Sequence, residues 1–183
     1  MPRIPYLDMS EASPEYQDML KGRHNLNLYR MLPHATTIAP GFLKMGGAIL
    51  RESALDPQLR EVAILRVGFL SNASYEVHQH KRVARNVGVS DAKIAALEHD
   101  PASAVFSPLE QLIIRYTDEV VKNVKASDAL FKELLAQLDN RRMAELTLTI
   151  GFYMAVSRFL ENFEVEIEPA PPPSGSHVKY SAN

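Results

Sequence analysis

The sequence of 183 residues contains no cysteine. A chain without cysteine forms no disulfide, offers no thiol nucleophile and ligates neither an iron–sulfur cluster nor a cysteine-bound zinc ion. Long apolar runs are also missing, since none approaches the roughly 20 residues that cross a bilayer. The first residues lack the apolar stretch of a secretory signal. We therefore expect a cytoplasmic protein that has no membrane partner.

An excess of basic residues is absent as well. Lysine and arginine number 20 against 22 aspartates and glutamates, which gives a net charge of −2. Nucleic-acid-binding proteins usually carry a basic stripe, so we expect no nucleic-acid partner. The remaining composition, 46% hydrophobic and 23% charged, is typical of a globular chain, and the length suits one domain.

The pattern of the chain predicts an all-α fold, because no segment alternates apolar and polar residues with the period of a strand. Serine or aspartate before proline marks helix starts at Ser13, Asp56 and Ser107. The first helix is expected to reach residues 28–32, and Asn140 is expected to cap a long final helix. We predict an oligomeric bundle of seven or eight helices in one domain, residues 1–168. A proline-rich tail, residues 169–183, is expected to be disordered or to lie over a neighbouring subunit.

Residues 59–88 are the part of the chain around which the fold is expected to form. Residues 62–70 are apolar on every side except for Arg66 and Gly68, which predicts a helix in the middle of the protein. A tight turn at residues 71–74 then leads to a second helix that carries Tyr75, Glu76 and His80. The glycine in the first helix is expected to permit close contact between helices. Ionisable groups in an apolar centre are the only chemistry that the sequence indicates.

A proton relay is the interpretation that joins these groups. Glu76 and His80 are four residues apart, hence neighbours on one helix face. Glu61, on the preceding helix, is close enough to reach His80 if the second helix returns antiparallel. A carboxylate fixes the tautomer of an imidazole and raises its basicity, so that the ring exchanges protons with a substrate. Tyr75 is a candidate donor to a developing oxyanion.

Each of these residues also has a purely structural explanation. A single histidine on an apolar helix face is more often a satisfied core residue, and an acid at position 61 is favoured by the dipole of a helix start. A tyrosine at position 75 is more often a packing residue. His78 is expected to point to solvent.

Substrate and metal binding remain open from the residues alone. Arg66 either pairs with a buried carboxylate or binds an anionic substrate, and Asn72 in the turn is the second candidate for substrate binding. A metal held by Glu61, Glu76 and His80 is the less favoured alternative, because no pair of histidines four apart stands out with a third ligand. We expect neither a metal nor a cofactor.

The spacing of Glu61, Ala73, Glu76 and His80 resembles the carboxymuconolactone decarboxylase and AhpD-like superfamily. Its peroxidase branch has the pattern Glu-x11-Cys-x2-Cys-x3-His, and here alanine and glutamate stand at the two thiol positions. The variant with Tyr75 before Glu76 is similar to decarboxylase-like members. The resemblance spans about residues 28–166. It implies an AhpD-like helical bundle that assembles into dimers, trimers or hexamers, with the active site near subunit interfaces.

The resemblance implies a cofactor-independent lyase that acts on a small organic acid or lactone. In that hypothesis His80 donates the proton, Glu61 orients the ring and Glu76 is a second acid or base, while Arg66 or Tyr75 holds the substrate. Thiol peroxidase activity is not expected without thiols. Two alternatives stay open: a peroxidase-like relative that has lost its thiols, and a non-catalytic small-ligand binder.

Overall fold

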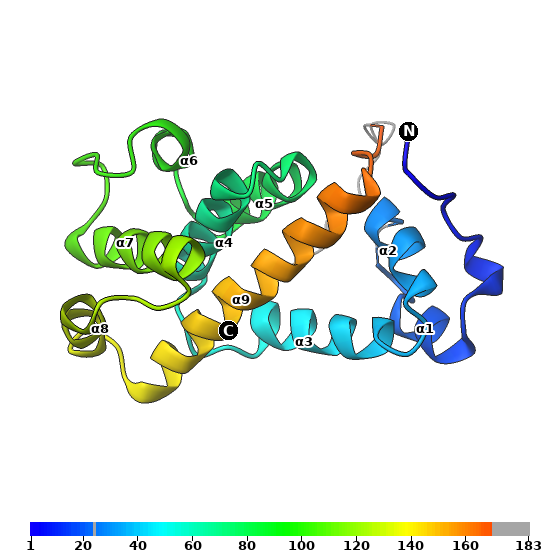
Figure 1. The fold of residues 1–183 in the computed structure, drawn as a ribbon, viewed down its shortest axis with the longest axis horizontal. Helices are drawn as coiled ribbons and strands as arrows, with labels where there is room; N and C mark the ends of the chain where they lie inside the picture. Colours follow the sequence, from blue (N-terminus) through cyan, green and yellow to red (C-terminus); the bar gives the residue numbers. More distant parts are fainter. Residues whose placement is uncertain (24, 170–183) are drawn as a thin grey trace.

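The computed structural model describes residues 1–23 and 25–169, and this part of the chain is all helical and contains no strand (Figure 1). It forms nine α-helices, namely α1 (Pro14–Met19), α2 (Asn27–Met31), α3 (Ala39–Arg51), α4 (Pro57–Leu70), α5 (Ser74–Asn86), α6 (Asp91–His99), α7 (Pro108–Asn123), α8 (Asp128–Leu135) and α9 (Asn140–Phe163). Two 3₁₀ turns, Met9–Glu11 and Leu32–His34, complete it. The all-α class is confirmed. Residues 170–183, which hold almost all of the expected proline-rich tail, lie outside the described residues.

The expected number of seven or eight helices is wrong, because two separate helices, α1 and α2, form where the sequence predicted a single first helix. Helix α1 ends at Met19, and Gly22 adopts a φ of 75°, a left-handed conformation that glycine tolerates and a helix does not. Helix α2 then starts afresh at Asn27. Residues 28–32 therefore belong to a separate short helix and the 3₁₀ turn after it.

Most helix starts follow the caps that the sequence indicates. Side chains of Ser13, Asp56 and Ser107 accept hydrogen bonds from the first turn of α1, α4 and α7. Ser107 and Glu110 form the reciprocal capping box. The predicted cap of α9 is wrong by one residue: Asp139 accepts from the backbone nitrogen of Arg142 at 2.8 Å, and Asn140 is the first helical residue.

Helix α4 is the centre of the molecule, as its apolar pattern predicts. It packs on α5, α7 and α9, and each of its residues from position 60 to 68 is buried. Gly68 makes the close return of α5 possible, because a Cβ atom at this position would lie 2.9 Å from Cγ2 of Val77. Helix α9 crosses the molecule in front of α4, from α8 at one end to α2 at the other (Figure 1).

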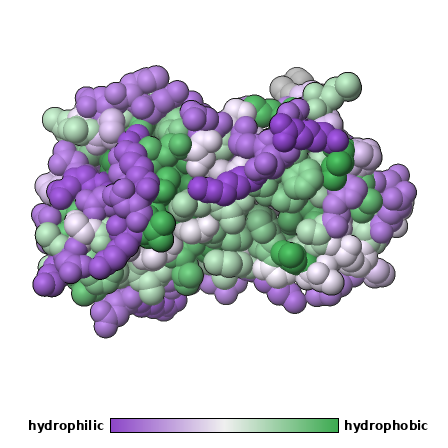
Figure 2. Space-filling model, in the orientation of Figure 1, coloured by the Kyte–Doolittle hydropathy of each residue, from purple (hydrophilic) through white to green (hydrophobic). Residues whose placement is uncertain are grey.

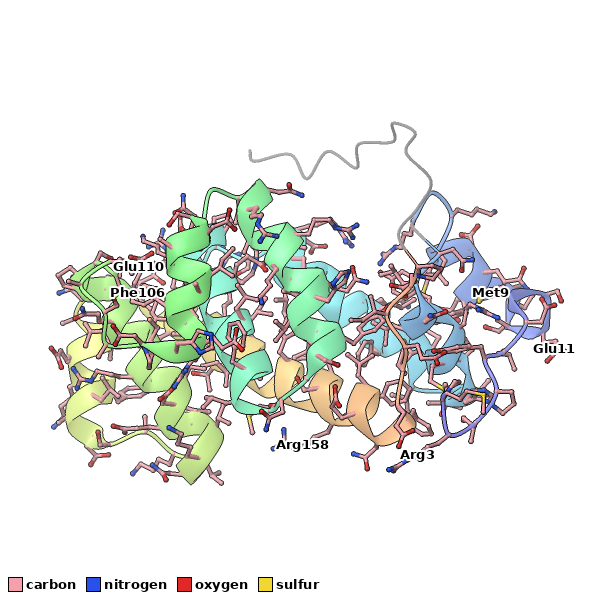
Figure 3. The ribbon with its side chains drawn as sticks, turned by 90° about the horizontal axis from the view of Figure 1, so that it is seen from above. Arg3, Met9, Glu11, Phe106, Glu110 and Arg158 are labelled. Atoms are coloured by element: carbon pink, nitrogen blue, oxygen red, sulfur yellow. The ribbon has the colours of Figure 1, made fainter. Side chains whose placement is uncertain are left out.

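The N-terminal helices form a second, smaller cluster beside this core. Tyr16, Leu32 and Leu43 are buried together where α1, α3 and the 3₁₀ turn meet. The segment that follows α9 runs back along the N-terminal residues, and Arg3 Nε donates to Glu164 Oε1 at 2.9 Å beside it (Figure 3). Among the described helices, none has both the length and the apolar character that a membrane crossing requires.

Candidate active site

His80 lies between two carboxylates at the contact of α4 and α5. Its Nδ1 is 2.6 Å from Glu61 Oε2, and its Nε2 is 3.0 Å from Glu76 Oε1. Helix α4 supplies Glu61, and α5 supplies the other two from successive turns of one face. The expected contact between Glu61 and His80 is therefore present. Glu61 is fully enclosed, and His80 is only 7% exposed.

Charges of opposite sign alternate through this cluster. Arg60 Nε donates to Glu61 Oε1 at 3.2 Å, so Glu61 is held between a guanidinium and the imidazole of His80. Glu76 follows on the other side of the ring. A buried charge is costly unless it is paired and hydrogen-bonded, and each charge here has a partner of the other sign. The cluster thus holds an ionised histidine in a place where water is scarce.

The protonation of His80 follows from this arrangement. Burial lowers its pKa, but the negative charges of Glu61 and Glu76 and the hydrogen bonds to both outweigh burial and raise the pKa to about 10. The ring is therefore an imidazolium at neutral pH, and both of its N–H groups donate. A buried imidazolium with its two protons aimed at defined acceptors is a proton donor.

A cavity of about 120 Å³ lies next to His80, between α5 and α9 on one side and α3 and residues 23–29 on the other. Glu76 and His80 form part of its polar wall, and most of the rest is apolar, including Leu28, Phe42 and Val156. Three arginines, one each from the segment after α1, the end of α3 and α5, also line it: Arg23, Arg51 and Arg82. No carboxylate of the described residues is paired with any of them. The cavity joins an apolar body to a cationic rim.

Tyr75 lines the cavity, but its hydroxyl is engaged. It donates to Glu168 Oε1 at 2.6 Å, and Gln79 Nε2 donates to the other oxygen of Glu168 at 2.8 Å. Burial, and then the bond to Glu168, raise the pKa of Tyr75. The backbone nitrogen of Asn27 also donates to Glu168, so this carboxylate ties the segment after α9 to α2 and α5. No pattern around position 168 indicates this contact in the sequence.

The two predicted substrate-binding residues lie away from the cavity. Arg66 holds Asp118 with two hydrogen bonds, of 2.6 and 2.9 Å, and donates to the Leu97 carbonyl at 2.7 Å. Of its two explanations, pairing with a carboxylate is the one present. Asn72 is exposed in the α4–α5 turn with a φ of 50°. His78 is exposed on the outer face of α5, as expected.

Tyr153 of α9 is a wall residue that the sequence did not single out. Its ring stands edge-on to the His80 ring, with centroids 4.8 Å apart and an interplanar angle of 83°. Burial, and then the charges of Glu76 and Glu61, raise the pKa of Tyr153 well above its ordinary value. Position 153 lies in the apolar middle of the final helix, and nothing local distinguishes its tyrosine from a packing residue. Among the described residues no cluster of three or more histidines, aspartates and glutamates has the arrangement of a metal site.

Part of the chain is similar in sequence to a known protein family. Residues 37–119 match the carboxymuconolactone decarboxylase family, a range that contains Glu61, Glu76 and His80. No curated protein sequence matches the chain.

Solved structures share the fold at low sequence identity. An uncharacterized peroxidase-related protein from Ralstonia eutropha JMP134 with an alkylhydroperoxidase AhpD core is 14% identical, with a TM-score of 0.82 over 91% of this chain and 92% of that one. A peroxidase-related protein from Silicibacter sp. TM1040 is 15% identical, with a TM-score of 0.75 over 91% and 94%. A cysteine-to-alanine variant of the debrominase Bmp8, in complex with 2,3,4-tribromopyrrole, is 17% identical, with a TM-score of 0.73 over 92% and 94%.

Proposed function

We propose that the chain, whose residues 37–119 match the carboxymuconolactone decarboxylase family and whose fold is similar to that of AhpD-like proteins, is a lyase that decarboxylates a small organic acid or lactone. One observation carries this proposal: His80 is held as a buried imidazolium between Glu61 and Glu76 beside a cavity. Fixing the orientation and protonation of an imidazole in this way is what general acid catalysis requires. The reaction needs no cofactor.

The chemistry runs in two steps. In the first, the bond between the substrate carbon and its carboxylate breaks, carbon dioxide leaves, and the electron pair passes to a neighbouring carbonyl, which becomes an enolate oxygen. In the second step, Nε2 of His80 gives up its hydrogen bond to Glu76 and transfers its own proton to the carbanionic carbon. Glu61 holds Nδ1 throughout, and Glu76, which borders the cavity, takes up a proton from solvent and passes it to Nε2 of the ring, so that each turnover consumes one proton from water.

The cationic rim supplies the binding of an acid. Arg23, Arg51 and Arg82 face the cavity, whereas Arg66 is occupied by Asp118. Arginine holds carboxylates through paired N–H groups, and the apolar wall accepts the rest of a small molecule. We therefore assign substrate binding to the three rim arginines, with the reacting carbon turned inward to His80.

The test is carbon dioxide release from a panel of β-keto acids and carboxylated lactones. We expect His80→Gln to abolish release, with circular dichroism as the check that it still folds. His78→Gln is the matched control, since the same change two residues away affects an exposed side chain. Activity in His80→Gln would refute the assignment. If the wild type binds acids and releases no carbon dioxide, the chain is a small-ligand binder.

A thiol-based reaction is the alternative that the family suggests. Reduction of a peroxide by a protein thiol needs a thiolate and a resolving partner, and this sequence has no cysteine. We expect no peroxide turnover by the pure protein with a dithiol as reductant. Turnover under these conditions would contradict the lyase proposal.

We also propose that the chain is a homo-oligomer that buries an apolar face of α3 and α9. Figure 2 shows hydrophobic side chains gathered over the middle of the molecule, where α9 crosses α3. The exposed large hydrophobic side chains include Met45 of α3 and Leu148 of α9, the second of them 58% exposed. Gly151, on the same helix as Leu148, has open space where a Cβ would be. Contiguous apolar surface of this kind marks protein–protein contacts.

A further inference from the structure

Of the three tyrosines that line the cavity, Tyr29, Tyr75 and Tyr153, the last two are buried, and the situations of their hydroxyls differ. The hydroxyl of Tyr75 donates to Glu168 and accepts a long hydrogen bond from the Leu28 nitrogen at 3.4 Å. The hydroxyl of Tyr153 has no hydrogen-bond partner among the described residues. A buried tyrosine usually finds a partner for its O–H, so the second case calls for an explanation.

The free hydroxyl of Tyr153 opens onto the cavity. The side chain is 3% exposed, and it lines the cavity together with Glu76 and His80. Ser157 Oγ is the one side-chain polar atom of the described residues that is both sealed from solvent and unpartnered. The Tyr153 hydroxyl is therefore not enclosed in packed hydrocarbon. Among the described residues it has no hydrogen-bond partner, and the cavity that Tyr153 lines offers room for one from a ligand.

Ring contacts hold this hydroxyl in place before any ligand arrives. Tyr153 stands edge-on to His80 on one side, and the ring of Phe152 is 5.5 Å away at 86°. A donor that is fixed in a water-poor site stabilises developing negative charge without the cost of reorientation. The O–H also keeps its proton, because burial and the nearby carboxylates oppose ionisation.

We propose that Tyr153 is a further catalytic residue, whose hydroxyl donates a hydrogen bond to the oxyanion that forms on the substrate. No proton is transferred in this contact, and no bond breaks. While the substrate loses carbon dioxide, the enolate oxygen takes the hydrogen bond from Tyr153 and the carbon takes the proton from His80. The identity of the oxyanion rests on the proposed lyase reaction, whereas the donor site itself does not.

Tyr75, the donor that the sequence suggested, is less suited to this role. Freeing its hydroxyl would leave one oxygen of Glu168 without this donor and would loosen the contact of the C-terminal segment with α2 and α5. Tyr153 can donate to a ligand with no such loss. The Tyr75 hydroxyl thus has a structural role, whereas the Tyr153 hydroxyl is available to a ligand.

The test uses 4-nitrophenol, whose phenolate oxygen stands in for the enolate oxygen and whose two protonation states differ in visible absorbance. We expect Tyr153→Phe to bind the phenolate on the order of tenfold to a hundredfold more weakly than the wild type, the usual range for a hydrogen bond to a charged acceptor. Tyr116→Phe is the matched control. It removes another buried hydroxyl, which bonds Thr147 Oγ1 at 2.8 Å outside the cavity, and should leave affinity unchanged.

Two further measurements keep the test decisive. The imidazole resonances of His80 should be the same in wild type and Tyr153→Phe, because a role through His80 would shift them. In wild-type protein labelled at the tyrosine Cζ, the Tyr153 signal should move on addition of the phenol, and the Tyr116 signal should not. This second measurement needs no variant and so does not depend on folding of Tyr153→Phe.

Three results would overturn the proposal: no phenolate binding by the wild type, unchanged affinity in Tyr153→Phe, or an equal or larger loss in Tyr75→Phe. Failure of the lyase proposal looks different. A protein that releases no carbon dioxide from any acid, yet loses phenolate affinity with Tyr153→Phe, keeps the donor site and loses only the reaction.

Discussion

Glu61 Oε2 and His80 Nδ1 are 2.6 Å apart, although the two residues are separated by 19 positions in the chain. The tight turn between α4 and α5 and the close approach at Gly68 bring them together. Because both are buried, the carboxylate stabilises the imidazolium far more strongly than it would in water. Above the ordinary pKa of a histidine, His80 therefore holds its charge only in the folded protein, so the pH dependence of the free energy of unfolding reports on it.

The stability of the protein should decrease as the pH rises from about 6.5 to about 10. The pKa of His80 is raised from 6.5 to about 10, so in this range the folded protein holds a proton that the unfolded chain has released. Such a group loses its stabilising contribution at up to about 1.4 kcal/mol per pH unit. Urea unfolding at a series of pH values measures this slope. His80→Gln should lack it, and parallel curves for the two proteins would contradict the prediction.

Replacing Glu61 with glutamine should lower the pKa of His80. The amide keeps the size of the side chain and can still accept from Nδ1, but the charge that is the leading cause of the raised pKa is gone. NMR titration of the His80 ring measures the change directly. We expect carbon dioxide release to fall about 100-fold, within the usual contribution of general acid catalysis.

Glu76→Gln is the comparison for this change, since it removes the second carboxylate from the other nitrogen of the same ring. It should lower the pKa of His80 by a smaller amount, because Glu61 is the larger of the two raising causes. An unchanged His80 pKa in Glu61→Gln would show that the two groups are not coupled as the distance indicates.

Local patterns were enough to predict the contact of Glu61, Glu76 and His80, because the three residues obey short-range rules. Glu76 and His80 share a helix face by their spacing, and an antiparallel return after a tight turn brings Glu61 to the ring. The same rules located the buried α4 and the role of Gly68. They failed at the break between α1 and α2, where a single left-handed glycine ends a pattern that reads as continuous.

The remainder of the site depends on contacts between distant parts of the chain. Tyr75 and Glu168 are 93 positions apart, and no spacing rule joins them. Tyr153 and the rim arginines come from α9, α3, α5 and the segment after α1, so only the packed fold shows that they border one cavity. Arg66 could not be assigned either, because its partner Asp118 lies on α7.

The role of Arg51 in binding an acid can be tested without replacing any arginine, because a change at a neighbouring residue should displace its side chain. Gly47 lies one turn before Arg51 on α3, and a Cβ atom at position 47 would collide with the Arg51 guanidinium. Gly47→Ala should therefore push Arg51 from its place and weaken the binding of a small carboxylate by about tenfold, roughly the value of one charged hydrogen bond. Calorimetric titration with benzoate measures the loss.

Gly41→Ala is the control for this effect. It makes the same change in the same helix at a position with no heavy atom within 4 Å of the added Cβ. Both changes favour the helix by about 1 kcal/mol in intrinsic propensity, so a general effect on α3 would appear in both. Equal affinities for the two variants would remove Arg51 from the binding site.

The proposed oligomer should dissociate when a charge is placed on its apolar face. Leu148 is 58% exposed on α9, next to the contact between Gly46 of α3 and Phe152 of α9. Leu148→Glu would bury an unpaired carboxylate in an interface at this face, a cost of several kcal/mol, while leaving the folded subunit in contact with water as before. Sedimentation velocity at micromolar concentration should show an oligomer for the wild type and a monomer for the variant.

Val124→Glu is the control, since Val124 is 89% exposed on the loop after α7, and this variant should sediment like the wild type. A monomeric wild type would refute the oligomer, and an oligomeric Leu148→Glu would place the interface on another face.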